Sequence, residues 1–209
     1  IILPLLIFSI LLTSCGTEQN GCKKHKDSDN DLLCDVCSSS VLVYYNLYSV
    51  NDLSNSKADS EKLTEYLEKV LKADEDAIFL SAGNMFGDDK DITEWMNELE
   101  FSAMALGNLD LSLGVEDLND AQESADFPFL AINIFARKND KLAKFCKAST
   151  LLEIDGFKIG VIGAVGDCYS EVEPNSINDY YFKTGDELTK LVKDESKRLR
   201  KKGADYIVY

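Results

Sequence analysis

From residue 41 onward, short apolar runs alternate with amphipathic segments, and this alternation constrains the fold more than any other feature. Short apolar runs rich in β-branched and aromatic residues are typical of buried strands, whereas apolar residues spaced three and four apart are typical of helices. Strands are expected at 41–50, 77–82, 102–107, 128–133, 150–154, 158–164 and 205–209, and helices at 59–72, 91–100, 115–124 and 186–202. Strands and helices in alternation indicate an α/β protein with a largely parallel or mixed sheet.

Asn and Asp residues follow the first four of these expected strands. Asp52 follows the first strand, Asn84 the second, Asn108 and Asp110 the third, and Asn133 the fourth. One such residue is ordinarily a turn former. Because the carboxyl ends of parallel strands meet at one edge of a sheet, four successive instances indicate a functional site at that edge.

Six segments together resemble a known family in their order and spacing. They are 50–54 (VNDLS), 80–86 (LSAGNMF), 105–110 (ALGNLD), 127–134 (FPFLAINI), 156–163 (GFKIGVIG) and 203–208 (GADYIV). This pattern is similar to the bacterial 5'-nucleotidase and cyclic phosphodiesterase branch of the metallophosphoesterases, over about residues 41–209. The resemblance implies a four-layer α/β/β/α sandwich, present here as its N-terminal part. It also implies a site with two divalent metal ions, such as manganese or zinc, that hydrolyses nucleotide phosphate esters.

Carrying the family's roles onto this sequence exposes losses at three positions. The resemblance makes Asp52 and Asn108 metal ligands, but Asn84 stands where an aspartate bridges the two metals. Ser54 and Leu109 stand at two histidine positions, the second of them catalytic. Two adjacent dications need an anionic bridge, and a leucine cannot transfer a proton to a leaving group. The sequence therefore predicts a degenerate domain that acts as a binding or scaffold module.

Two alternatives remain open. An active nucleotidase or phosphodiesterase would have rebuilt its site around Asp52 and Asn108, and a nucleoside-capture lipoprotein would bind without turnover. Asp110 and Asn133 are supporting residues, and in the family the acidic residue at position 110 orients the catalytic histidine. The net charge of -15 excludes nucleic-acid binding by bulk electrostatics, because neutralising phosphates requires a basic surface. No protein partner is identified by the sequence.

The N-terminus predicts export. Residues 1–12 are apolar and uncharged, but a membrane-spanning helix needs about 20 residues. The run matches the core of a secretion signal, and the following Leu-Thr-Ser-Cys-Gly resembles a bacterial lipobox, which implies lipid attachment at Cys15. We expect a signal peptide at 1–14, a linker at 15–40 and a domain at 41–209 that is truncated at its C-terminus. The protein would sit on the extracytoplasmic face of the cell membrane. A plain signal peptide, or a core strand with an incidental cysteine, is the alternative.

The linker carries a small cluster of metal-ligand residue types. Cys22, His25, Cys34 and Cys37 have the spacing of a structural zinc site. Asp27, Asp29 and Asp31 alternate like the first ligands of a calcium loop, but the glycine and glutamate of such a loop are absent, which makes calcium the weaker prediction. Two disulfides, or an acidic spacer without order, are the alternatives. Cys146 and Cys168 are expected to form a disulfide or to remain buried thiols.

Overall fold

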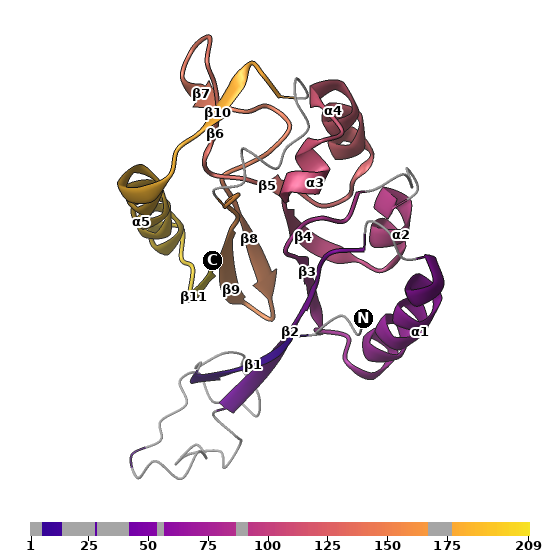
Figure 1. Ribbon diagram of the computed structural model, residues 1–209. Coiled ribbons are helices and arrows are strands. Elements are labelled where there is room, and N and C mark those ends of the chain that lie inside the picture. Colours follow the sequence, from indigo (N-terminus) through magenta and orange to yellow (C-terminus); the bar gives the residue numbers. More distant parts are fainter. Residues whose placement is uncertain (1–5, 14–27, 29–41, 54–56, 87–91, 167–176) are drawn as a thin grey trace.

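The computed structural model describes residues 6–13, 28, 42–53, 57–86, 92–166 and 177–209 (Figure 1). Its first sheet has the strand order β1-β2-β3-β4-β5. These strands are β1 (Leu6–Thr13), β2 (Leu42–Val50), β3 (Ile78–Ser81), β4 (Phe101–Ala105) and β5 (Phe129–Leu130). β2 to β5 run parallel, and β1 pairs antiparallel with the outer edge of β2. Within the described residues, no helix has both the length and the apolar character that crossing a membrane requires.

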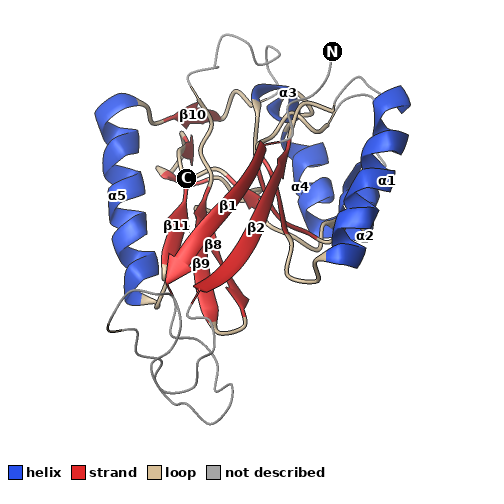
Figure 2. Cartoon of the chain, turned by 90° about the horizontal axis from the view of Figure 1, so that it is seen from below, coloured by secondary structure: helices blue, strands red, loops and turns tan. Residues whose placement is uncertain are grey.

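Helices cover the outer face of each of two sheets (Figure 2). The helices on the first sheet are α1 (Lys57–Ala73), α2 (Ile92–Glu98), α3 (Asn108–Leu111) and α4 (Val115–Ser124). A second sheet has the order β11-β9-β8, with β8 (Ser149–Ile154), β9 (Phe157–Ile162) and β11 (Tyr206–Val208), and α5 (Gly185–Lys201) packs on it. The layers are therefore helices, sheet, sheet and helix, which confirms the α/β/β/α sandwich expected from the sequence.

A small antiparallel sheet was not expected from the sequence. It has the order β10-β6-β7 and consists of β6 (Ile134–Ala136), β7 (Lys141–Leu142) and β10 (Tyr180–Phe182). The strand expected at 128–133 is correspondingly shorter, because the backbone leaves the first sheet after Leu130. The N–H of Ala131 donates to the carbonyl of Lys147 (2.9 Å), and that of Ile132 donates to Gly163 (2.8 Å). The chain thus crosses from the first sheet toward the second and then enters the small sheet.

Side chains that alternate along the strands of the first sheet point to its two faces and belong to two separate hydrophobic cores. In β3, Ile78 and Leu80 face the second sheet, whereas Phe79 faces the helices and is fully buried. The Phe79 ring contacts Tyr48 (5.4 Å between ring centroids) and Phe101 (5.8 Å). Burying one such side chain contributes about 1.5–3 kcal/mol. β3 is therefore fixed from both faces, which holds the loop that follows it in place.

The N-terminal apolar run forms β1, with a register from Leu6 opposite Ser49 to Thr13 opposite Leu42. This is the segment that the sequence assigns to an export signal, with a plain signal peptide or a core strand as the alternatives, and the structure has it as a strand at the edge of the first sheet. The export signal stays a prediction. The lipobox Cys15 and the cluster of Cys22, His25, Cys34 and Cys37 lie outside the described residues.

Candidate functional site

Hydrogen bonds donated by backbone N–H groups join the loops that follow β2, β3 and β4. The N–H of Asp52 donates to the carbonyl of Gly83 (3.0 Å), and the N–H of Leu109 donates to Oδ1 of Asn84 (3.1 Å). Asp52 and Asn84 both have left-handed backbones, with φ of 64° and 56°. Asn and Asp adopt this conformation more readily than other residues with side chains. The structure therefore brings together the first three of the four strand ends singled out in the sequence.

Two glycines allow these loops to lie directly against each other. A Cβ atom on Gly83, which has φ of 101°, would lie 2.6 Å from the backbone nitrogen of Gly107. A Cβ atom on Gly107 would lie 2.1 Å from Oδ1 of Asn84. Both separations are far below van der Waals contact. The Gly-Asn pair that occurs at 83–84 and again at 107–108 is a sequence feature that could have indicated this close approach.

The buried side chain of Asp110 connects the loop after β3 with the loop after β4. Its fully buried carboxylate accepts four backbone N–H bonds: Oδ1 from Met85 and Phe86 (both 2.9 Å), and Oδ2 from Asn84 and Gly107 (both 2.8 Å). Burial raises the pKa of this carboxyl from 3.8 to about 6, while the four N–H donors act in the opposite direction. In this chain, Asp110 acts as a brace between loops rather than as a partner for the side chain at position 109.

The remaining candidate positions of this edge lie on or beside α3. Asn108 is the first residue of α3, and its side chain is half-buried. Leu109 follows with 36% of its surface exposed, so an apolar side chain lies at the edge of the site, at the position that the resemblance assigns to the catalytic histidine. Ser54, at the position that the resemblance assigns to another histidine, lies outside the described residues.

Asn133 is buried and serves a different part of the fold. Its Nδ2 donates to the carbonyls of Val165 (2.8 Å) and Lys183 (3.2 Å), and its Oδ1 accepts the N–H of Val165 (2.9 Å). The side chain thereby links the ends of β5, β9 and β10. Its polar atoms are engaged by backbone groups, so its role is to join the sheets.

The residues present do not fit a two-metal centre. Asp52 supplies one carboxylate, whereas Asn84 and Asn108 supply neutral amides, and the Asn84 oxygen already accepts a backbone N–H. Across the ranges that the structure describes, no group of three or more His, Cys, Asp or Glu side chains is placed to hold a metal ion. Two dications bound side by side require anionic ligands to offset their repulsion, and among the described residues of this edge Asp52 is the one carboxylate not already held by backbone N–H groups.

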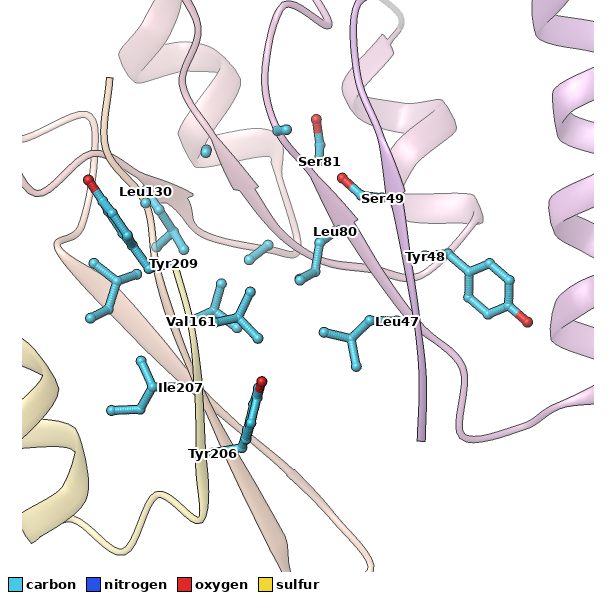
Figure 3. Close-up of a pocket in the computed structure, with 16 residues that line it drawn as sticks. Leu47, Tyr48, Ser49, Leu80, Ser81, Leu130, Val161, Tyr206, Ile207 and Tyr209 are labelled. Carbon is cyan, nitrogen blue, oxygen red and sulfur yellow. The ribbon is translucent and has the colours of Figure 1, made fainter. Parts of the chain in front are cut away.

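A cavity of about 440 Å³ lies between the two main sheets (Figure 3). Leu47, Leu80 and Val161 point toward one another across it, and Tyr206 and Tyr209 lie on the side of β11. Every lining residue is uncharged. An apolar space without a cation is unsuited to a phosphate group, because burying an unpaired charge is costly.

Cys146 is a free, buried thiol whose Sγ donates to the carbonyl of Ala131 (3.4 Å). Burial raises its pKa to about 12. Of the two alternatives that the sequence left open for this residue, the structure has the free thiol. Cys168 lies outside the described residues.

Comparison with known proteins gives one similarity in sequence and many in structure. No family model matches the chain. A 5'-nucleotidase of Mus musculus is 28% identical over 113 residues, which are 49% of this chain and 20% of that protein. Calcineurin-like phosphoesterase YfkN from Bacillus subtilis has a TM-score of 0.65 at 16% identity, covering 77% of this chain and 59% of that chain. The 5'-nucleotidase precursor from Thermus thermophilus has a TM-score of 0.58 at 22% identity, covering 69% and 29%.

A further solved structure, the NAD nucleotidase of Haemophilus influenzae, has a TM-score of 0.56 at 22% identity and covers 69% of this chain and 26% of that chain. The chain thus spans about a fifth of the curated relative and between a quarter and three fifths of these solved chains. The four layers agree with this similarity in structure. The chain has the metallophosphoesterase fold of these solved structures, and about half of it is similar in sequence to a 5'-nucleotidase.

Proposed function

We propose that this chain is a 5'-nucleotidase-like metallophosphoesterase domain that no longer hydrolyses phosphate esters and acts as a binding or scaffold module. The observation that carries the proposal is the pairing of Asn84 with Leu109. The amide oxygen of Asn84, at the position of the metal bridge, accepts the N–H of Leu109, whose side chain replaces the proton donor.

The chemistry of phosphate-ester hydrolysis supports this proposal. Two cations clamp the phosphate and generate the attacking hydroxide, so the negative charge of the bridging ligand is essential. A neutral amide at residue 84 lacks that charge. The leaving oxygen also needs a proton, and an aliphatic side chain at residue 109 has none to transfer. Loss of either function alone lowers the rate by orders of magnitude, and this chain lacks both.

Metal binding and hydrolysis by the full chain test this proposal. The chain is equilibrated with excess Mn²⁺, desalted and analysed for bound metal, and AMP hydrolysis is then measured. Mn²⁺ is chosen because it prefers oxygen ligands to thiolates, and the comparison with the Asp52→Asn variant removes any Mn²⁺ that Asp27, Asp29 and Asp31 hold. We expect the parent and the Asp52→Asn variant to retain the same amount of Mn²⁺, so that no bound Mn²⁺ depends on Asp52. We also expect no AMP hydrolysis by the parent.

Gain of function provides the matched control. The Asn84→Asp/Leu109→His double variant restores the bridging charge and the proton donor, and we expect it to retain more Mn²⁺ than the parent. Two Mn²⁺ per parent chain that depend on Asp52, together with AMP turnover, would refute the proposal. Saturable binding of adenosine without turnover would instead favour nucleoside capture over a scaffold role.

We also propose that the protein is exported and lipid-anchored at Cys15. The support lies in the order of an uncharged apolar run, small residues and Cys-Gly at residues 1–16. In a bacterial host, labelled palmitate should be incorporated into the full chain and not into the Cys15→Ser variant. Equal labelling of both chains would refute anchoring at this residue.

A further inference from the structure

One short segment of this acidic protein is strongly basic. Residues 137–147, which run from the end of β6 through β7 and into the following loop, contain five cations and one acid. The cations are Arg137, Lys138, Lys141, Lys144 and Lys147, here called the hairpin patch, and all five are exposed. The whole chain has a net charge of -15, so the hairpin patch is a local reversal of its charge.

The acid within the segment, Asp140, is already compensated. Nζ of Lys183 lies 3.0 Å from Oδ1 of Asp140, which also accepts a hydrogen bond from the Tyr181 hydroxyl. These two partners lower the pKa of Asp140. The Lys183 ammonium also lies over the Phe135 ring, 3.8 Å from its centroid. Asp140 is thus held by the cation of Lys183, which directly follows β10, and it does not neutralise the hairpin patch.

The five cations have no such compensation among the described residues. None of them forms an ion pair with any residue in that part of the chain. At the basic end of α5, two of the five cations at 197–202 form ion pairs, Lys197 with Asp194 (3.4 Å) and Arg198 with Glu195 (2.5 Å), and Arg200 donates to the carbonyls of Ala204 and Asp205.

The hairpin patch lies on a segment whose backbone is hydrogen-bonded to neighbouring segments. The N–H of Arg137 donates to the carbonyl of Asp179 (2.8 Å), and the N–H of Ala143 donates to the carbonyl of Ile134 (2.9 Å). In the loop after β7, Phe145 and Cys146 are buried while the lysines on either side of them are exposed. The lysines therefore emerge from an anchored segment, and Figure 1 shows β7 at the top of the molecule with α5 running downward away from it.

The composition of the patch indicates its partner. Lysine is depleted in protein–protein interfaces, whereas arginine and aromatic residues are enriched there. The hairpin patch has four lysines and one arginine. A lysine ammonium is a flexible point charge, which suits a diffuse array of anions better than one stereospecific ligand. Because charges are screened beyond about 8–10 Å at physiological salt, distant acids of this chain do not cancel the patch.

We propose that the hairpin patch docks on the anionic headgroups of a lipid bilayer. Each basic residue near an anionic membrane surface strengthens binding by about fivefold. Such docking would hold the small sheet against the membrane. The proposal does not depend on loss of phosphoesterase activity or on lipid attachment at Cys15.

Vesicle binding tests the proposal with the full chain. Partitioning is measured by sedimentation with vesicles of phosphatidylcholine alone and of phosphatidylcholine with phosphatidylglycerol, at about 0.1 M salt, where the distant acids of the chain are screened. The ratio of the two partition coefficients removes the contribution of the apolar N-terminus, which is common to both. We expect a ratio well above one that falls as salt is added.

Two triple variants with the same change in net charge separate local from overall charge. Lys138→Gln/Lys141→Gln/Lys144→Gln should lower the ratio on the order of 100-fold, from about fivefold per lysine. The control neutralises three exposed lysines of α5, Lys190, Lys193 and Lys201, and should keep the ratio within about twofold of the parent. Equal losses in both variants, or a ratio near one for the parent, would overturn the proposal. Self-association of the parent that is lost in the patch variant, with vesicle binding unchanged, would assign this face to a second copy of the chain and also overturn it.

Discussion

The brace formed by Asp110 should make the stability of the folded chain depend on pH. Burial raises the pKa of this carboxyl from 3.8 to about 6, so the folded chain holds the proton more tightly than the unfolded chain does. As the pH rises from about 4 to about 6, the unfolded chain releases this proton first, and the free energy of unfolding falls. The contribution of the Asp110 proton to the free energy of unfolding is fully present below pH 3.8 and is lost above about pH 6. At about 1.4 kcal/mol per unit of pKa, it amounts to about 3 kcal/mol.

The Asp110→Asn variant isolates this contribution, because its amide has nearly the same shape and does not titrate. Urea unfolding of both chains is measured at about pH 4 and about pH 7.5. The other acidic groups titrate in both chains, so their effect cancels in the comparison. We expect the parent to lose about 3 kcal/mol more than the variant between these pH values. If the parent instead gains stability relative to the variant as the pH rises, the four N–H donors outweigh burial and the reasoning fails.

Three further predictions concern packing and reactivity. Gly83→Ala should cost about 2–4 kcal/mol of unfolding free energy by thermal or urea unfolding, because its Cβ meets the neighbouring loop at 2.6 Å and φ is positive. Gly166→Ala is the matched control, with no atom within 4 Å of its Cβ, and a similar loss in both would contradict the argument from close approach. Leu118→Ala, in a fully buried position, should cost about 2–5 kcal/mol, whereas Leu109→Ala should cost about 1 kcal/mol or less. Iodoacetamide should modify Cys146 at the rate of unfolding, and fast labelling of the native chain would show that this thiol is accessible.

The arrangement of the main sheets was predictable because its signal is local and repeated. Apolar runs such as 42–50 and 157–162 lie close to their expected bounds, as does the amphipathic helix at 57–73. The resemblance to phosphoesterases also gave the four layers. By contrast, β6, β7 and β10 have two or three residues each, too few for a periodic pattern, and their pairing depends on contacts distant in sequence.

Candidate site residues were easier to find than their roles. Asp52, Asn84 and Asn108 were singled out as strand-end residues, and backbone bonds do join the first two of these loops. The role of Asp110 was not apparent, because an acidic residue that orients a neighbour and one that accepts four backbone N–H bonds look the same in a sequence. Asn133 illustrates the same limit, since its partners Val165 and Lys183 are 32 and 50 residues away along the chain.

The way the loops are held explains how this fold tolerates a neutral residue at position 84. In a two-metal site, an aspartate there would be fixed partly by the cations it bridges. Here the backbone of the loop is fixed by Asp110, which accepts N–H bonds from residues 84, 85 and 86, and the Asn84 side chain accepts an N–H bond from Leu109. Each of these bonds is made within the protein and needs no metal ion. The loops can therefore keep their shape without a charged side chain at position 84, and the Asn84→Asp variant tests whether a charge at this position supports metal binding.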